Sequence, residues 1–155
     1  MNGAAPSQPR PTAPVMRDSF SVTFLASETE ARERVCAVAQ RLRRAGIATE
    51  RAGEIELTLA EAVNNVVEHA YAGAAPGPVR LCCDLDGRRL GVRICDLGLA
   101  LPEGRPPRGK AADLSCPRAD LPEGGFGWFL IRAFASSVRY DRCRGRNVLA
   151  LRFDL

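Results

Sequence analysis

Residues 61–71 read EAVNNVVEHAY, and polar side chains recur within this segment at every fourth position. Glu61, Asn65 and His69 would therefore share one stripe on an α-helix. Most of the intervening residues are apolar, so we expect the helix to be buried, and a buried carboxylate and amide need polar partners. Two interpretations are open at this point. The stripe is either an internally satisfied hydrogen-bond network, or a site where the amide oxygen binds a hard cation and the carboxylate acts as a base beside it.

Hydrophobic periodicity predicts the elements on either side of this helix. Alternating apolar positions predict half-buried strands, two of which flank Asp86-Gly87 as a hairpin. Ser27 followed by Glu30 is typical of a helix N-terminus. The order of elements favours an α+β fold, a two-layer sandwich with helices on one face of a mixed, mostly antiparallel sheet. The expected strands are 20–24, 79–85, 90–95, 138–140 and 148–153, and the expected helices follow Ser27, open at Thr49 and span 128–135.

Nine of the eleven prolines lie in two stretches that we expect to lack regular structure. Residues 1–17 carry four of them and are predicted to be a disordered tail. Residues 102–124 carry five and are predicted to be a long loop, of the kind that often serves as a lid over a binding site. The remaining chain, residues 18–155, is expected to form a single domain that includes this lid.

Composition and charge argue against several classes of function. The 155 residues are 46% hydrophobic and 26% charged, with no apolar run long enough to span a membrane and no N-terminal secretion signal, so we expect a soluble, cytoplasmic protein without a membrane partner. The net charge of +4 is mild, and the basic cluster Arg41, Arg43 and Arg44 lacks interleaved aromatic residues, which argues against nucleic-acid binding. Six cysteines without C-x-x-C spacing and a single histidine argue against a zinc site and favour reduced thiols that fill a core.

Two further motifs follow along the chain. Asp96 ends an expected strand and Gly98 comes two residues later, an arrangement that suits hydrogen bonding to a flat heterocycle but also fits an ordinary Asx turn. Residues 124–127, GGFG, open an expected helix, where backbone N–H groups and the helix N-terminus would favour an anion. Taken singly, this motif also fits a plain loop-to-helix junction.

The order and spacing of the three motifs resemble the Bergerat ATP-binding fold, and most closely the bacterial anti-sigma factor serine kinases. Residues 61–71 are similar to that family's E-A-V-x-N-x-x-x-H-x-Y segment, and residues 125–131 to its G-x-G-x-x-L-I helix start. Residues 138–147 resemble its closing hairpin through Val138-x-Tyr140 and Gly145-x-Asn147. The resemblance extends over residues 20–153 and implies an ATP- and Mg²⁺-dependent protein serine/threonine kinase.

The resemblance implies a role for each matching residue. Glu61 would be the general base that accepts the proton of an attacking serine hydroxyl, and Asn65 would hold Mg²⁺ through its side-chain oxygen. Asp96 would accept a hydrogen bond from the adenine amino group. His69 would brace the helix rather than act in catalysis. The other expected ATP-binding residues are Gly98, which would give the ring room, Gly125, Phe126 and Gly127 at the phosphates, and Asn147, where the wider superfamily keeps a Thr near adenine.

Two positions depart from the family pattern. Ala100 stands in place of the second Gly of the usual D-x-G-x-G, which would tighten the adenine loop. Glu123 stands where some relatives place an Arg near the terminal phosphate. A cation for that phosphate would then come from the lid, whose candidates are Arg105, Arg108, Lys110 and Arg118.

The function implied by the resemblance is phosphorylation of a serine on a small anti-anti-sigma partner, with a sigma factor as a second, sequestered partner. An alternative is a nucleotide-responsive switch that binds partners and transfers little or no phosphate. A detached histidine-kinase catalytic domain would need an acceptor histidine from another chain, because the single histidine of this chain lies within residues 61–71. By family analogy we also expect a homodimer, formed through strand 20–24 or the first helix, and no nucleic-acid partner.

Overall fold

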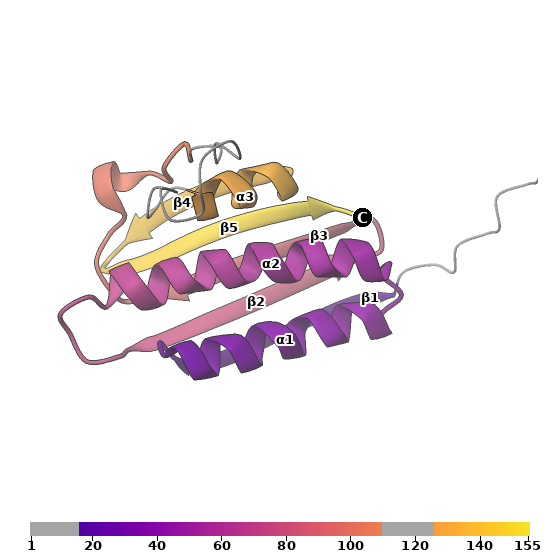
Figure 1. Cartoon of the computed structure of the whole chain (residues 1–155), viewed down its shortest axis with the longest axis horizontal. Coiled ribbons are helices and arrows are strands. Elements are labelled where there is room, and N and C mark those ends of the chain that lie inside the picture. The colour runs from indigo at the N-terminus through magenta and orange to yellow at the C-terminus, as the bar shows by residue number, and fades with distance from the viewer. Residues whose placement is uncertain (1–15, 110–125) are drawn as a thin grey trace, which may run out of the picture.

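In the part of the chain that the structure describes, five strands form one sheet and three α-helices pack on one of its faces (Figure 1). The structure is a computed structural model, and it describes residues 16–109 and 126–155. The strand order across the sheet is β1-β2-β3-β5-β4. The strands are β1 (Arg17–Leu25), β2 (Pro78–Asp86), β3 (Arg89–Asp96), β4 (Ser137–Cys143) and β5 (Arg146–Asp154), and the helices are α1 (Glu28–Arg44), α2 (Thr49–Asn65) and α3 (Phe126–Phe134), with a π-helical turn η1 (Val66–Ala70) and a 3₁₀ turn η2 (Pro102–Gly104).

The predicted α+β, two-layer fold class is confirmed, but the expected mixed character of the sheet is not found. All four strand pairs of the described sheet are antiparallel. The connection between β1 and β2 explains why. It contains two helices, α1 and α2, that run against each other, so the chain re-enters the sheet at the end where β1 leaves it and Leu25 pairs with Pro78, whereas a single crossover helix would produce a parallel pair.

Local sequence signals set the ends of the first elements. Ser27 caps α1 as predicted, because its Oγ accepts a hydrogen bond from the Glu30 backbone N–H at 3.3 Å. The Glu30 carboxylate reaches back to the Leu25 backbone N–H at 3.0 Å, which joins the cap to the end of β1. At the β2–β3 hairpin, Asp86 accepts two backbone hydrogen bonds that lower the pKa of its carboxyl group, and Gly87 takes the positive φ of +89° that the turn requires.

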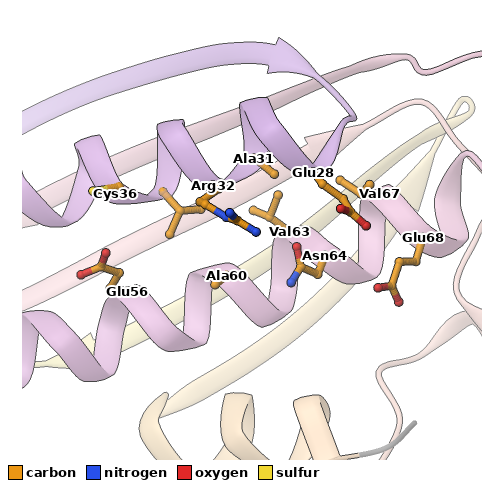
Figure 2. A pocket seen from close by; sticks show the side chains of 11 residues that line it. Glu28, Ala31, Arg32, Cys36, Glu56, Ala60, Val63, Asn64, Val67 and Glu68 are labelled. Carbon is orange, nitrogen blue, oxygen red and sulfur yellow. The ribbon is translucent and has the colours of Figure 1, made fainter. Parts of the chain in front are cut away.

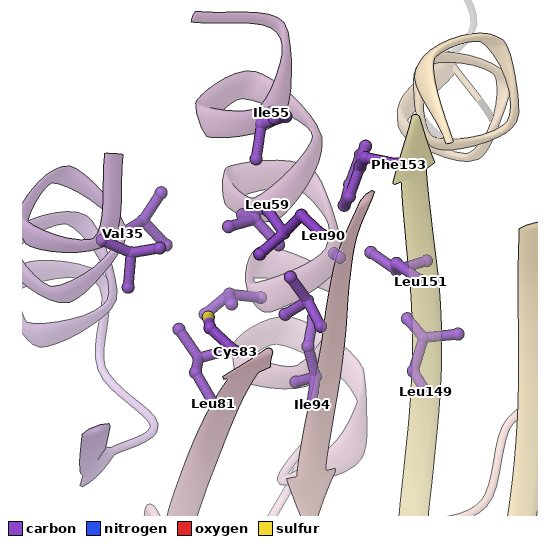
Figure 3. Packing of buried hydrophobic residues seen from close by; sticks show 14 of the residues in the cluster. Val35, Ile55, Leu59, Leu81, Cys83, Leu90, Ile94, Leu149, Leu151 and Phe153 are labelled. Atoms are coloured by element: carbon purple, nitrogen blue, oxygen red, sulfur yellow. The ribbon is translucent and has the colours of Figure 1, made fainter. Parts of the chain in front are cut away.

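The core lies between the helices and the inner face of the sheet (Figure 3). Leu59 of α2, Leu81 of β2 and Phe153 of β5 are completely buried there. Cys83 also belongs to this core, and burial raises the pKa of its thiol to about 12. The prediction that the cysteines fill the core is otherwise wrong for the described residues, because Cys36, Cys82 and Cys95 are half-buried and Cys143 is exposed.

Parts of two predicted segments lie outside the described residues. These are residues 1–15 of the predicted tail and residues 110–124 of the predicted lid. The described part of the predicted lid begins with the 3₁₀ turn η2. The last residue of the predicted tail, Arg17, is the first residue of β1. Among the described helices, none has the length and apolar character needed to cross a membrane.

Candidate functional site

Residues from the sequence motifs meet around one small cavity at the ends of α2, β3 and β5. Asn65, Asp96 and Asn147 all contribute to its wall, although they are far apart in the sequence. The cavity has a volume of about 50 Å³. Its other lining residues are Ala62, Val66, His69, Ala70, Leu99, Ala100, Leu101, Pro102, Trp128, Tyr140 and Leu149.

Glu61 and Asn65 lie one turn apart near the end of α2, as predicted, and both are half-buried rather than fully enclosed. The Asn65 Nδ2 donates to the Glu61 backbone carbonyl at 2.9 Å, which holds the amide in place and leaves Oδ1 as an acceptor. Glu61 Oε2 lies 2.5 Å from the position that a Cβ on Gly127 would occupy. The fold therefore brings Gly127 at the start of α3 against the carboxylate on α2, and a side chain at 127 would displace that carboxylate.

His69 lines the same cavity as Asn65, but at its exposed edge. After Asn65 the helix changes to the π-helical turn η1, which places more residues in each turn and shifts later side chains around the axis. The His69 side chain is 68% exposed at the edge of the cavity, and its recorded partner is the neighbouring Glu68 at 3.8 Å. The expectation that His69 braces the helix by packing is therefore wrong, because an exposed ring has little to pack against.

Asp96 and Asn147 form a buried polar pair. Both side chains are at most 5% exposed, and the two residues are direct register partners on β3 and β5. Asp96 Oδ1 accepts from Asn147 Nδ2 at 2.7 Å and from the Gly98 backbone N–H at 2.9 Å. The Asx-turn and functional interpretations of Asp96 are therefore compatible, since the turn uses one oxygen of the carboxylate.

Gly98 is required by a close backbone contact. A Cβ at this position would lie 2.2 Å from the carbonyl oxygen of Ala70, at the end of η1. The same carbonyl accepts a hydrogen bond from the Leu99 backbone N–H at 2.6 Å. The loop after β3 is thus held directly against the end of η1, which gives Gly98 a structural reason beyond the expected room for an adenine ring.

Three aromatic or cationic side chains form hydrogen bonds next to the cavity, and the sequence analysis assigned none of them a role. Tyr71 accepts from the Leu97 N–H at 3.0 Å and donates to the Pro78 carbonyl at 2.8 Å. Tyr140 and Arg142 both reach Asn147 from β4. Their i, i+2 spacing, which puts both on one face of a strand, is the sequence signal that could have pointed to them.

The described part of the lid is tied to α3. Arg132 donates to the backbone carbonyls of Pro107 and Pro106 at 2.9 and 3.1 Å. Of the cations proposed for the terminal phosphate, Arg105 is paired with Glu103 at 2.8 Å, and Arg108 is exposed. The other positions singled out in this region, Lys110, Arg118, Glu123, Gly124 and Gly125, lie outside the described residues.

A wider groove lies on the other side of α2, between α1 and α2 (Figure 2). It has a volume of about 430 Å³ and contains none of the predicted site residues. Asn64 and Glu68, which lie within the 61–71 motif, face this groove instead of the cavity, opposite Arg32 of α1. The two neighbouring asparagines of the motif therefore belong to different surfaces.

The comparisons with known proteins show the family of the chain. The family model described as the histidine kinase-like ATPase domain matches residues 24–153. The chain belongs to this family. Membership of an ATPase domain family implies ATP as the nucleotide, as the sequence predicts, whereas Mg²⁺ remains a prediction.

Similar curated proteins have kinase names. The chain is 28% identical over 112 residues to the serine-protein kinase RsbW of Bacillus cereus strain AH820, covering 71% of this chain and 69% of the relative. It is 32% identical over 94 residues to the serine/threonine-protein kinase BtrW of Bordetella bronchiseptica, covering 59% and 62%. These matches confirm the resemblance to the anti-sigma factor serine kinases.

A solved structure shares the fold. It contains the RsbU and RsbW domains of Rv1364c from Mycobacterium tuberculosis, with a TM-score of 0.60 and 20% sequence identity. The match covers 89% of this chain and 32% of that chain, so the present chain spans about a third of the solved protein. The likeness supports the predicted Bergerat-type fold.

Proposed function

We propose that this chain is an ATP- and Mg²⁺-dependent protein serine kinase that phosphorylates a small anti-anti-sigma protein. The single observation that carries the proposal is the position of the Glu61 carboxylate, beside Asn65 and against Gly127 at the start of α3. A protein that only binds nucleotide has no need of a carboxylate there. The names of the curated relatives, all serine or serine/threonine kinases, support the same reaction.

The side chains present fit a magnesium ion. Mg²⁺ prefers a few oxygen ligands from protein and takes the remainder from water and substrate phosphates. Asn65 offers an amide oxygen at the edge of the cavity, because its Nδ2 is already bonded to the helix backbone. When bound, the ion would neutralise charge on the triphosphate.

Glu61 would act as the general base in the transfer step. The serine Oγ of the partner forms a bond with the γ-phosphorus while the bond from that phosphorus to the β–γ bridging oxygen breaks, and ADP leaves. Glu61 takes the hydroxyl proton. Gly127, together with Gly125 and Phe126 of the same motif, would donate backbone hydrogen bonds to the phosphates. Because phosphoryl transfer depends mostly on positioning and charge neutralisation, this small set of groups is sufficient.

Asp96 and Asn147 would hold the adenine base. A carboxylate at the end of a rigid strand can accept a hydrogen bond from the exocyclic amino group of adenine. The cavity of about 50 Å³ has room for only a few water molecules, each of which needs about 10–15 Å³ of such volume, and this is less than a purine needs. The segment 99–102, which forms part of the wall, would therefore move outward when nucleotide binds.

Serine phosphorylation of a defined partner tests the proposal. The chain is incubated with Mg²⁺, γ-labelled ATP and a small anti-anti-sigma protein, and phosphoserine is measured on the partner. We expect label on one serine of the partner with the native chain, loss of Mg²⁺-dependent ATP binding in Asn65→Ala, and native behaviour in Asn64→Ala, which alters the neighbouring asparagine on the groove side of α2. ATP binding without any phosphoserine would reject the kinase.

The alternative is a nucleotide-responsive switch that binds partners without transferring phosphate. The small cavity and Ala100 in its wall favour this alternative, because they restrict the adenine loop. A partner pull-down that depends on ATP but leaves no phosphoserine would support it. A sigma factor as sequestered partner, homodimer formation through β1 or α1, and a cytoplasmic location are proposed on the family resemblance.

A further inference from the structure

We propose that Arg142 and Tyr140 are positioning residues for base recognition, which hold the Asn147 amide so that Asp96 presents its Oδ2 to the nucleotide. The inference rests on the proposed function in one respect, namely that the cavity beside Asp96 takes the base of ATP. It assigns to β4 a part in nucleotide selection, since both side chains come from this edge strand.

The orientation of the Asn147 amide follows from the chemistry of its neighbours. Arg142 Nη1 donates to Asn147 Oδ1, and a guanidinium has donors only, so the amide oxygen must face it. The Tyr140 hydroxyl accepts from the Leu101 N–H at 3.1 Å and therefore directs its own proton to the same Oδ1, at 2.6 Å. Two donors thus fix the oxygen side of the amide, and its NH₂ group must point the other way.

The NH₂ group of Asn147 in turn determines which oxygen of Asp96 remains for a ligand. It donates to Asp96 Oδ1 at 2.7 Å and to the Leu99 carbonyl at 2.9 Å. Asp96 Oδ1 also accepts from the Gly98 N–H, so both of its lone-pair directions are used. Among the described residues, no donor reaches Asp96 Oδ2, and Asp96 lines the cavity. The fixed arrangement therefore offers one carboxylate oxygen as an acceptor.

A single oriented acceptor discriminates between purine bases. An exocyclic amino group, as in adenine, can donate to Asp96 Oδ2, whereas a carbonyl group at the same place, as in guanine, would set two acceptors against each other. If the amide of Asn147 could turn over, its oxygen would face Asp96 and the carboxylate would lose both a hydrogen bond and its fixed direction. Arg142 and Tyr140 both oppose this turn, and Arg142 also holds the loop by donating to the Gly98 carbonyl at 2.9 Å.

The test compares ATP and GTP affinities in four proteins by isothermal titration with Mg²⁺ present. Arg142→Gln can accept as well as donate, so one of the two donors that orient the Asn147 oxygen is lost, and we expect ATP affinity to fall about tenfold while GTP affinity is unchanged. Arg142→Lys keeps a donor-only side chain and should retain most of the discrimination. Arg139→Gln removes a cation from an exposed position of the same strand and should match the native chain.

The outcomes separate this inference from the proposed function. A native chain that prefers ATP, together with an unchanged ATP/GTP ratio in Arg142→Gln, overturns the positioning role alone. A native chain that binds neither nucleotide overturns the proposed function and the inference with it. If Arg142→Gln does not fold, Tyr140→Phe provides the second test, because it keeps the ring and removes the hydroxyl donor. We expect the ATP/GTP ratio to fall in that variant too, and an unchanged ratio there overturns the inference.

Discussion

The two ends of the candidate site are built differently. At one end, Asp96 and Asn147 are buried on neighbouring strands, and protein hydrogen bonds occupy the Asn147 amide and the Oδ1 of Asp96. At the other end, Glu61 and Asn65 are half-buried on a helix and have one recorded hydrogen bond between them. The first end is pre-formed, because paired strands hold its donors and acceptors in register. The second end has carboxylate and amide oxygens still available for a ligand.

This difference has a physical cause. A buried carboxylate costs free energy unless it accepts hydrogen bonds, so Asp96, at the proposed adenine end, needs donors from the protein. A partly exposed carboxylate is hydrated and needs no such network. The Glu61 carboxylate at the proposed phosphate end can therefore stay charged without a protein partner until a metal–triphosphate binds. The predicted effects of substitution differ accordingly between the two ends.

The largest effect is expected at the proposed phosphate end. Glu61→Gln removes the base but keeps the size of the side chain, so we expect phosphoryl transfer to fall by about 10²–10⁴-fold with ATP affinity close to native. Single-turnover transfer and titration with ATP measure the two quantities separately. Glu68→Gln, on the groove side of the same motif, is the control and should transfer phosphate normally. Native transfer in Glu61→Gln would remove this residue from the mechanism.

At the proposed adenine end, substitution should lower ATP affinity more than it lowers phosphoryl transfer. Asp96→Asn retains an oxygen for the Gly98 N–H but places an NH₂ group where the adenine amino group would donate. We expect ATP affinity to fall by about 10–100-fold, while transfer at saturating ATP changes much less. Titration and saturation kinetics test this, with Asp84→Asn on the exposed face of β2 as control. Unchanged affinity in Asp96→Asn would mean that the base binds elsewhere.

The contact between the two ends can be tested through stability. Gly98→Ala places a methyl group 2.2 Å from the Ala70 carbonyl, and because this is backbone it cannot turn aside. We expect a loss of about 1–3 kcal/mol in the free energy of unfolding, measured by urea denaturation. Gly53→Ala, in the interior of α2 with nothing within 4 Å, should instead gain about 0.5–1 kcal/mol. Equal stabilities would show that the loop gives way to the methyl group.

The smallest effect is expected at Ala100. This residue is exposed at the wall of the cavity and has no positive φ, so a glycine fits without strain. Ala100→Gly should loosen the loop and raise the rate of nucleotide entry. The equilibrium affinity should stay within about fivefold, because the extra backbone freedom of a glycine costs roughly 0.5–1 kcal/mol. Stopped-flow binding of a fluorescent ATP analogue measures the rate. A rate equal to native would mean that Ala100 does not limit entry.

Periodicity predicted much of the fold because it acts over short distances. The capping pair Ser27 and Glu30, the Asp86-Gly87 hairpin and the helix through Glu61 and Asn65 all depend on contacts within a few residues. The π-helical turn after Asn65 was not predicted, because such a turn depends on how the helix end packs and leaves no simple repeat in the sequence. The antiparallel sheet likewise depended on how α1 and α2 return the chain.

The sequence by itself determined the spacing of polar and apolar residues along the helices and strands. That spacing was enough to predict the family and the candidates Glu61, Asn65 and Asp96. The tertiary structure decided which of these meet. Gly127 lies against Glu61, Gly98 against Ala70, and Asn147 is fixed by Tyr140 and Arg142. The first two contacts join residues tens of positions apart, and the third crosses the β4–β5 hairpin. Their geometry depends on sheet register and helix packing, which no local pattern specifies.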